Sequence, residues 1–292
     1  MTTPTLITAL PTLPPRAPDS HKGTYGKVLI VAGSRGMSGA AVLTAVGALR
    51  GGAGLVQLAV PAEVLPIVAG CNPCYLTAAL PQDGEGRLTA DAADAVCELA
   101  ATADVLAVGP GLGQSDGVTE LVRRLLDRVT VPLVIDADGL NALAKLGPLR
   151  CSAPAILTPH PGEFARLLGT TAAAVQQERE RLAVQCAEER GVVLVLKGYG
   201  TLVTDVRRLA RNPTGNAGMA KGGSGDVLTG LIAALLGQKL EPFAAAQLGV
   251  YLHGLAGDLA RAALGEVAML PTDLADFLAQ AFLHHSATRT AP

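Results

Sequence analysis

The sequence predicts an α/β fold, a doubly wound and mostly parallel sheet with helices on both faces. Short runs rich in valine, isoleucine and leucine alternate with longer runs rich in alanine and leucine, the order expected of βαβ units. Most of the short runs are apolar throughout, as in strands that are covered on both faces. With 292 residues, 49% of them hydrophobic, the chain is long enough to bury one large core.

Each expected element follows from its residue pattern. Strands are expected at 27–33, 54–60, 104–109, 132–137, 155–159, 192–198 and 201–205. Helices are expected at 38–52, 62–70, 117–128, 139–146, 161–168, 172–190, 226–237, 241–263 and 272–283. Because no repeat or low-complexity linker interrupts the chain, we expect one domain over 21–285. A loosely ordered lead-in at 1–20 and a tail at 286–292 are expected to flank it.

Composition and charge exclude several kinds of partner. The formal net charge is −2, so no basic face is expected to hold nucleic acid. No apolar run reaches the roughly 18 residues of a membrane-spanning helix, and the N-terminus lacks the basic start of a secretory signal. Five cysteines, an odd number, indicate thiols in a reducing compartment, and the cytoplasm is expected. Cys71 and Cys74 form a C-x-x-C without a second pair, so we expect small buried residues rather than a zinc or redox site.

The segment GGSGD at 222–226 comes directly before an apolar run that is expected to be a helix. Gly223, Ser224 and Gly225 let backbone N–H groups converge at the helix start, where the helix dipole favours phosphate. Asp226 beside such a cradle is placed to accept a proton, as a general base does in phosphoryl transfer. The alternative is a glycine-rich turn in which Asp226 only caps the helix.

A second glycine-rich loop places Lys197, Gly198, Tyr199, Gly200 and Thr201 between two expected strands. The small amount of side-chain bulk suits contact with a nucleotide, with Thr201 and backbone amides as donors. A tight β-hairpin without a ligand explains the same residues equally well.

Polar side chains follow two further strands. His160 and Glu163 start a helix, where Glu163 is placed to hold a water on Mg²⁺ and His160 to bond a substrate. Capping of the first helical turn is the alternative for both. Asp136, Asp138 and Asn141 suggest ligand or metal contact at another strand end. For Asp138, capping of the following helix is the alternative.

Two more glycine-rich turns follow strands. Gly33, Gly36 and Gly39 have the spacing G-x-x-G-x-x-G, which is not the dinucleotide fingerprint, and no Walker loop occurs. The segment VGPGLG at 108–113 permits close approach of a ligand to the backbone but is weak evidence alone. His253 lies in an apolar run and is expected to be a core residue.

Seven segments in this order closely resemble the NAD(P)H-hydrate dehydratase family. They are HKGTYGKVLIVAGSRGMSGAA, GAGLVQLAVP, GPGLG, DADGLNAL, TPHPGE, KGYGT and NPTGNAGMAKGGSGDVLTG. The resemblance covers about residues 20–280 and is far more specific than any single glycine pattern. It implies a ribokinase-like fold, an ADP-dependent enzyme of the stand-alone bacterial type, and a homo-oligomer, expected to be a tetramer.

The resemblance also implies a role for each set of residues. The base is Asp226, and the anion hole is Gly223, Ser224 and Gly225. The nucleotide contacts are Lys197, Gly198, Tyr199, Gly200, Thr201 and Gly225. The substrate contacts are Ala40, Gly111, Gly113, His160 and Asp226. Ala217 and Lys221 depart from the family's usual proline and small hydroxyl residue, and Lys221 is expected either to add charge near a phosphate or to face solvent.

The implied reaction repairs hydrated NADH and NADPH. The C6 hydroxyl of the S epimer is phosphorylated and phosphate is then lost, which gives NADH or NADPH, AMP and phosphate. Mg²⁺ is the expected cofactor and ADP the expected donor, with ATP as the alternative. Only some 20 residues precede the motifs, so an NAD(P)H-hydrate epimerase is expected on a separate chain. The rivals are a kinase of the same fold acting on a vitamin precursor or sugar, and a non-catalytic nucleotide-binding regulator.

Overall fold

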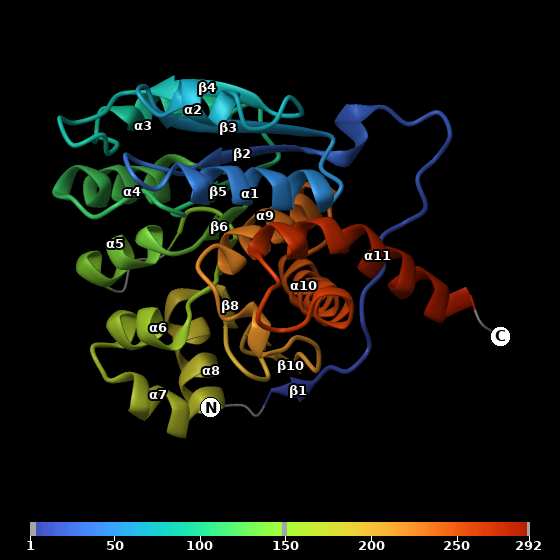
Figure 1. Cartoon of the computed structure of the whole chain (residues 1–292). Coiled ribbons are helices and arrows are strands. Elements are labelled where there is room, and N and C mark those ends of the chain that lie inside the picture. Colours follow the sequence, from blue (N-terminus) through green and yellow to red (C-terminus); the bar gives the residue numbers. More distant parts are fainter. Residues whose placement is uncertain (1–3, 148–150, 291–292) are drawn as a thin grey trace.

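The computed structural model describes residues 4–147 and 151–290, which are built around one ten-stranded sheet (Figure 1). The strand order is β1-β10-β9-β8-β7-β6-β5-β2-β3-β4, in which β9 alone is antiparallel to its two neighbours. The strands are β1 (Thr5–Leu6), β2 (Lys27–Val31), β3 (Leu55–Pro61), β4 (Leu76–Leu80), β5 (Val105–Val108), β6 (Leu133–Ile135), β7 (Ala155–Leu157), β8 (Val193–Leu196), β9 (Leu202–Thr204) and β10 (Arg208–Arg211). The prediction of a doubly wound, mostly parallel sheet is confirmed.

Helices cover both faces of this sheet. One face carries α1 (Ser38–Arg50), α2 (Leu65–Ala69), α9 (Ser224–Gly237), α10 (Pro242–Leu264) and α11 (Pro271–Thr290). The other carries α3 (Ala92–Ala100), α4 (Asp116–Arg128), α5 (Asp138–Leu146), α6 (Pro161–Leu168), α7 (Ala172–Gln177) and α8 (Arg179–Arg190). Figure 1 shows α10 and α11 on one side of the sheet and α5 and α6 on the other.

Successive residues of the central strands point into different cores. In β2, Val28 and Ile30 pack in the core beneath α1, α9 and α10, whereas Leu29 and Val31 pack in the opposite core. All four side chains are fully buried. Because side chains alternate between the faces of a strand, a strand covered on both faces needs apolar residues at every position. This is why continuous apolar runs predicted the central parallel strands β2, β3, β5, β6, β7 and β8 correctly.

Several elements lie outside the predicted pattern. The edge strand β4 has the sequence LTAAL and β10 has RLAR, so neither shows a long β-branched apolar run. The expected helix over 172–190 is two helices, α7 and α8, which are separated at Glu178. The helix expected from 226 begins two residues earlier, at Ser224.

The first residues of the chain differ from the expected loose lead-in. Thr5 and Leu6 pair with β10, and Gln247 Nε2 donates to the Ala9 carbonyl at 3.0 Å. His285, at the expected end of the domain, is buried in α11 and bonds the Pro11 carbonyl at 3.0 Å. The helix α11 continues to Thr290, past the expected boundary at 285. Of the lead-in and tail, residues 1–3 and 291–292 lie outside the described residues.

The five cysteines are free thiols, but Cys71 and Cys74 are exposed. The expectation that these two are buried is wrong, because they lie in the turn between α2 and the edge strand β4. Within the described ranges, no helix has both the length and the apolar character needed to cross a bilayer.

Candidate active site

The loops that carry the predicted site residues meet at one edge of the sheet. The strands β2, β5, β6, β7 and β8 are parallel neighbours, so their carboxyl ends lie together (Figure 1). The strand order reverses between β5 and β2, because β2 leads on to β3 and β5 leads on to β6. In open α/β sheets, ligands bind beyond the carboxyl ends of the strands at such a reversal.

A glycine-rich turn forms a cradle at the start of α9. Gly223 is the N-cap residue, with φ of 102°, and a side chain there would meet Leu43 Cδ1 at 2.5 Å. No side chain caps the helix, and Ser224 N–H donates to the Lys221 carbonyl at 3.3 Å. The start of a helix without a side-chain cap suits an anion. The Ser224 hydroxyl is buried and has no hydrogen-bond partner within the described residues. This segment, Gly223 to Gly225, is called the phosphate cradle below.

Asp226 is the third residue of α9 and does not cap it. The capping alternative is wrong, because Gly223 occupies the N-cap and the helix has no side-chain cap. Burial and the nearby charge of Asp136 together raise the pKa of Asp226 to about 7, against the opposing effect of Lys197. A carboxylate with a pKa near neutrality, beside an anion cradle, is suited to act as a general base.

Lys197 extends from the end of β8 toward the cradle. Its Nζ donates to Asp136 Oδ1 at 2.8 Å and lies 3.8 Å from Glu163 Oε2. Burial opposes the charge of Lys197, but Asp136 and Glu163 outweigh burial and raise its pKa above the usual value. The site therefore contains a fixed ammonium group between two carboxylates.

The loop from Lys197 to Thr201 joins β8 to β9 as an antiparallel hairpin. The hairpin alternative is thus confirmed as its conformation, and it leaves Tyr199 fully exposed. Thr201 Oγ1 donates to the Gly198 carbonyl at 2.9 Å. Arg179 supports the loop from behind, with donors 3.1 Å from the Leu196 carbonyl and 3.4 Å from the Lys197 carbonyl.

His160 and Glu163 cap the first turn of α6, which confirms the capping alternative for both residues. His160 Nδ1 accepts from the N–H groups of Gly162 and Glu163 at 3.0 and 3.3 Å, and Glu163 Oε2 accepts from His160 N–H at 2.8 Å. Burial and the charges of Lys197 and Arg166 lower the pKa of His160. With Nδ1 used as an acceptor, the neutral ring carries its proton on Nε2, which lies 3.4 Å from Glu163 Oε1.

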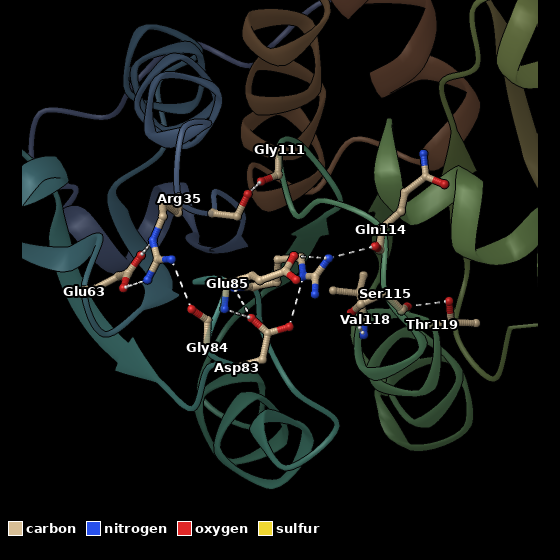
Figure 2. Close-up of polar contacts among 12 residues, drawn as sticks. Arg35, Glu63, Asp83, Gly84, Glu85, Gly111, Gln114, Ser115, Val118 and Thr119 are labelled. Atoms are coloured by element: carbon tan, nitrogen blue, oxygen red, sulfur yellow. Dashed lines mark hydrogen bonds and ion pairs between the residues drawn. The ribbon is translucent and has the colours of Figure 1, made fainter.

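The turn after β5 packs against the start of α1 (Figure 2). A Cβ on Gly111 would lie 2.9 Å from Ala40 Cβ, so only glycine permits this approach. The Ser34 hydroxyl donates to the Gly111 carbonyl at 2.8 Å. Figure 2 shows the Arg35–Glu63 ion pair on one side of Gly111 and Gln114 on the other. Two predicted substrate contacts, Ala40 and Gly111, are therefore adjacent.

A chain of hydrogen bonds links this turn to α6. Gly113 N–H donates to Asp138 Oδ2 at 2.8 Å, and Asp138 Oδ1 accepts from Asn141 Nδ2 at 3.0 Å. Asn141 Oδ1 in turn accepts from Arg166 Nε at 2.9 Å. The helix α5 has Ala137 as its N-cap residue, so the capping alternative for Asp138 is wrong.

Some residues of the site carried no clear sequence signal. Thr229, Arg179 and Ser34 contact site residues, yet each lies in a segment that reads as helix or loop. For Thr229 the signal is a hydroxyl side chain within the apolar part of α9, three residues after Asp226. Lys221 does not point freely into solvent, because its Nζ donates to the Val267 carbonyl at 2.8 Å.

No set of three or more histidine, cysteine, aspartate or glutamate side chains among the described residues is arranged to hold a metal ion. Both Glu163 oxygens already face polar partners. A contact to Mg²⁺ through water fits this arrangement, since Mg²⁺ usually retains several waters and binds few protein ligands directly.

Comparison with known proteins supports the resemblance. The family model described as NAD(P)H-hydrate dehydratase matches residues 28–280. The bifunctional NAD(P)H-hydrate repair enzyme of Moorella thermoacetica is 51% identical over 269 residues, which cover 91% of this chain and 51% of that one. This chain therefore spans about half the length of that bifunctional relative.

Two matches extend over nearly the whole of both chains. The ADP-dependent (S)-NAD(P)H-hydrate dehydratase of Bacillus subtilis is 38% identical over 268 residues, 91% of this chain and 92% of that one. The crystal structure of the ADP/ATP-dependent NAD(P)H-hydrate dehydratase from Bacillus subtilis, co-crystallised with ATP and Mg²⁺, matches with a TM-score of 0.83 and 36% identity over 94% of each chain. The ribokinase-like fold is thereby confirmed, and the chain belongs to the NAD(P)H-hydrate dehydratase family.

Proposed function

We propose that this protein is an ADP-dependent dehydratase that converts the S epimers of hydrated NADH and NADPH to NADH and NADPH. The observation that carries the proposal is Asp226, a carboxylate whose pKa burial raises to about 7, two residues into the helix that begins at the phosphate cradle. A base and an anion site at one helix start are the two parts that phosphoryl transfer to a hydroxyl requires.

In the proposed reaction, Asp226 accepts the proton of the C6 hydroxyl while that oxygen attacks the terminal phosphorus of ADP. The phosphoanhydride bond breaks and AMP leaves. The C6–O bond then breaks with loss of phosphate and of a proton from the neighbouring carbon, which restores the ring double bond. The backbone of Gly223 to Gly225, at the N-terminus of α9, is proposed to hold the transferred phosphoryl group.

The nucleotide is expected to lie against the hairpin loop from Lys197 to Thr201, whose Tyr199 side chain is fully exposed. Mg²⁺ supplies charge neutralisation at the phosphates when it is bound. Lys197 adds a fixed positive charge, and Glu163 is proposed to hold a water on the metal. The hydrated nicotinamide is expected to contact Ala40, Gly111, Gly113 and His160, which the loops bring to the same edge of the sheet.

The deciding experiment mixes the protein with the S epimer of hydrated NADH or NADPH, Mg²⁺ and either ADP or ATP. Recovery of the dihydronicotinamide absorbance, matched by an equal amount of released phosphate, is the expected result. ADP is expected to serve better than ATP and to leave AMP. A chelator is expected to stop the reaction, and the R epimer is expected to react only after an epimerase is added.

Two other outcomes would replace this proposal. If no reduced cofactor returns while a vitamin precursor or sugar accumulates as a phosphate ester, the protein is a kinase. If nucleotide binds and neither reaction proceeds, it is a binding protein without catalysis. We further propose a homotetramer, which light scattering would test, and the cytoplasm as its compartment, which five free thiols support.

A further inference from the structure

One carboxylate of the site has no role in the proposed reaction. Asp136 is 1% exposed, and both of its oxygens are engaged. Oδ1 accepts from Lys197 Nζ at 2.8 Å, and Oδ2 accepts from the Thr229 hydroxyl at 2.7 Å. Three segments distant in the sequence, the end of β6, the end of β8 and the first turns of α9, therefore meet at this one side chain.

These contacts favour a positioning role for this buried acid over the role of metal ligand or general base. A metal ligand or a general base needs an oxygen that faces the ion or the substrate, and here one oxygen faces an ammonium group and the other a hydroxyl. A purely stabilising ion pair is also a poor explanation, because desolvation offsets much of the attraction between buried charges. The Asp136–Lys197 pair is better explained by its effect on the position of the Lys197 ammonium group.

The pair lies directly beneath the phosphate cradle. A Cβ built on Gly225 would lie 3.1 Å from Lys197 Nζ and 3.7 Å from Asp136 Oδ2. Thr229 lies on the same helix one turn after Gly225, so its hydroxyl ties Asp136 to the element that carries the cradle. Asp136 thus connects the Lys197 ammonium group to Thr229 on α9, which fixes the position of that group relative to the cradle.

The backbone at this point is strained, which fits a functional constraint. Ala137 has φ of 50° and ψ of −115°, a conformation that costs a residue with a side chain about 1–3 kcal/mol. The carboxylates on either side of Ala137 have different partners. Asp136 accepts from Lys197 Nζ, and Asp138 accepts from the N–H of Gly113. One turn thereby serves both the Lys197 side and the Gly113 side of the site.

We propose that Asp136 is a positioning residue for nucleotide binding, which together with Thr229 holds the Lys197 ammonium against the phosphate cradle. The proposal rests on the proposed function only in taking the cradle as the site of the nucleotide phosphates. Without Asp136, the lysine keeps only the longer contact to Glu163 Oε2 at 3.8 Å, so the phosphates lose a cation held in one fixed position.

The test compares Asp136→Asn with the wild-type protein by calorimetric titration with ADP and Mg²⁺, and by steady-state kinetics. The dissociation constant and the KM of ADP are expected to rise about tenfold or more, since truncating one partner of a buried charge pair leaves the other unpaired. The KM of the hydrated dinucleotide is expected to stay within about twofold, because its proposed contacts do not include Lys197. A role in folding alone would lower the active fraction and leave both KM values unchanged.

Thr229 offers a second route if Asp136→Asn does not fold. Thr229→Val removes the hydroxyl and is expected to weaken ADP binding, whereas Thr229→Ser keeps the hydroxyl and is expected to restore it. Asp104→Asn is the matched control, because Asp104 pairs with Lys239 at the opposite end of β5.

Unchanged ADP affinity in folded Asp136→Asn and Thr229→Val would overturn the proposal. Because calorimetry needs no turnover, this result is distinct from failure of the proposed function, in which wild-type protein binds ADP but recovers no reduced cofactor.

Discussion

His253 Nε2 lies 2.9 Å from the main-chain carbonyl oxygen of Ser224, the first residue of α9. The imidazole is buried in α10, and burial lowers its pKa to about 4. The neutral ring must donate here, because a carbonyl oxygen can only accept. His253, which was expected to be a core residue, thus also forms a hydrogen bond to the backbone of the phosphate cradle.

The His253 contact predicts a pH dependence of stability. The folded pKa of about 4 lies below the usual 6.5, so the unfolded chain binds more protons between these values. The stability that the neutral ring contributes is fully present above pH 6.5 and is lost as the pH falls toward 4. In urea titrations across this range, His253→Gln is expected to lose less stability than the wild-type protein. Parallel curves for the two proteins would contradict the assignment.

A second prediction concerns Arg179, which donates to the carbonyls of Leu196 and Lys197 and has no carboxylate partner in the described part of the chain. Arg179→Met keeps the apolar stem but removes these charge-assisted hydrogen bonds, so the KM of ADP is expected to rise roughly tenfold. Arg181→Met is the matched control, because Arg181 lies on the same helix in an exposed pair with Glu178. Such pairs contribute little, about 0–1 kcal/mol. Equal effects of the two substitutions would argue against a role in the nucleotide loop.

The parts of the site that could be predicted from the sequence have local signals. Asp226 follows closely spaced glycines and precedes an apolar helix, and the loop after β8 stands out through Gly198 and Gly200. The central strands could be predicted because both of their faces are buried, so that every residue is apolar.

The remaining features depend on contacts between distant segments. Thr229 is one hydroxyl in a buried helix until the fold places it 2.7 Å from Asp136, 93 residues away. Arg179 is one of several charged residues in the helix α8, and nothing in the local sequence sets it apart. The strand β4 is missed because an edge strand needs no continuous apolar run. The strand β10 is missed because its four residues, RLAR, begin and end with arginine, and β1 because two residues give no periodicity.

A third prediction follows from the strain at Ala137. Glycine adopts positive φ readily, so Ala137→Gly is expected to raise the free energy of unfolding by on the order of 1 kcal/mol. At Ala144, inside the same helix, the identical change is expected to lower it by roughly 0.5–1 kcal/mol. Denaturant titration of both variants measures whether each substitution raises or lowers the free energy of unfolding. Destabilisation by Ala137→Gly would mean that the turn is not strained.

The last prediction concerns Asp226, whose burial and neighbouring carboxylates raise its pKa to about 7. As a base it must be ionised, so the rate of cofactor recovery is expected to rise with pH up to about 7 and then level off. Asp226→Asn is expected to lower the rate by roughly 10² to 10⁴, because an amide cannot accept the proton. ADP binding is expected to persist, since the cradle donates through its backbone.

The same substitution is expected to stabilise the protein at alkaline pH. The folded pKa of Asp226 lies above the usual 3.8, so the folded state holds the proton more tightly, and stability is lost as the pH rises through 7. Asparagine never ionises and avoids this loss, which makes the variant more stable than the wild-type protein at pH 8. Thermal unfolding at pH 5 and pH 8 measures the effect, with Asp104→Asn as a control for loss of a paired aspartate far from the cradle. A variant that is inactive but not stabilised would place the ionised carboxylate in a better solvated position than the structure gives it.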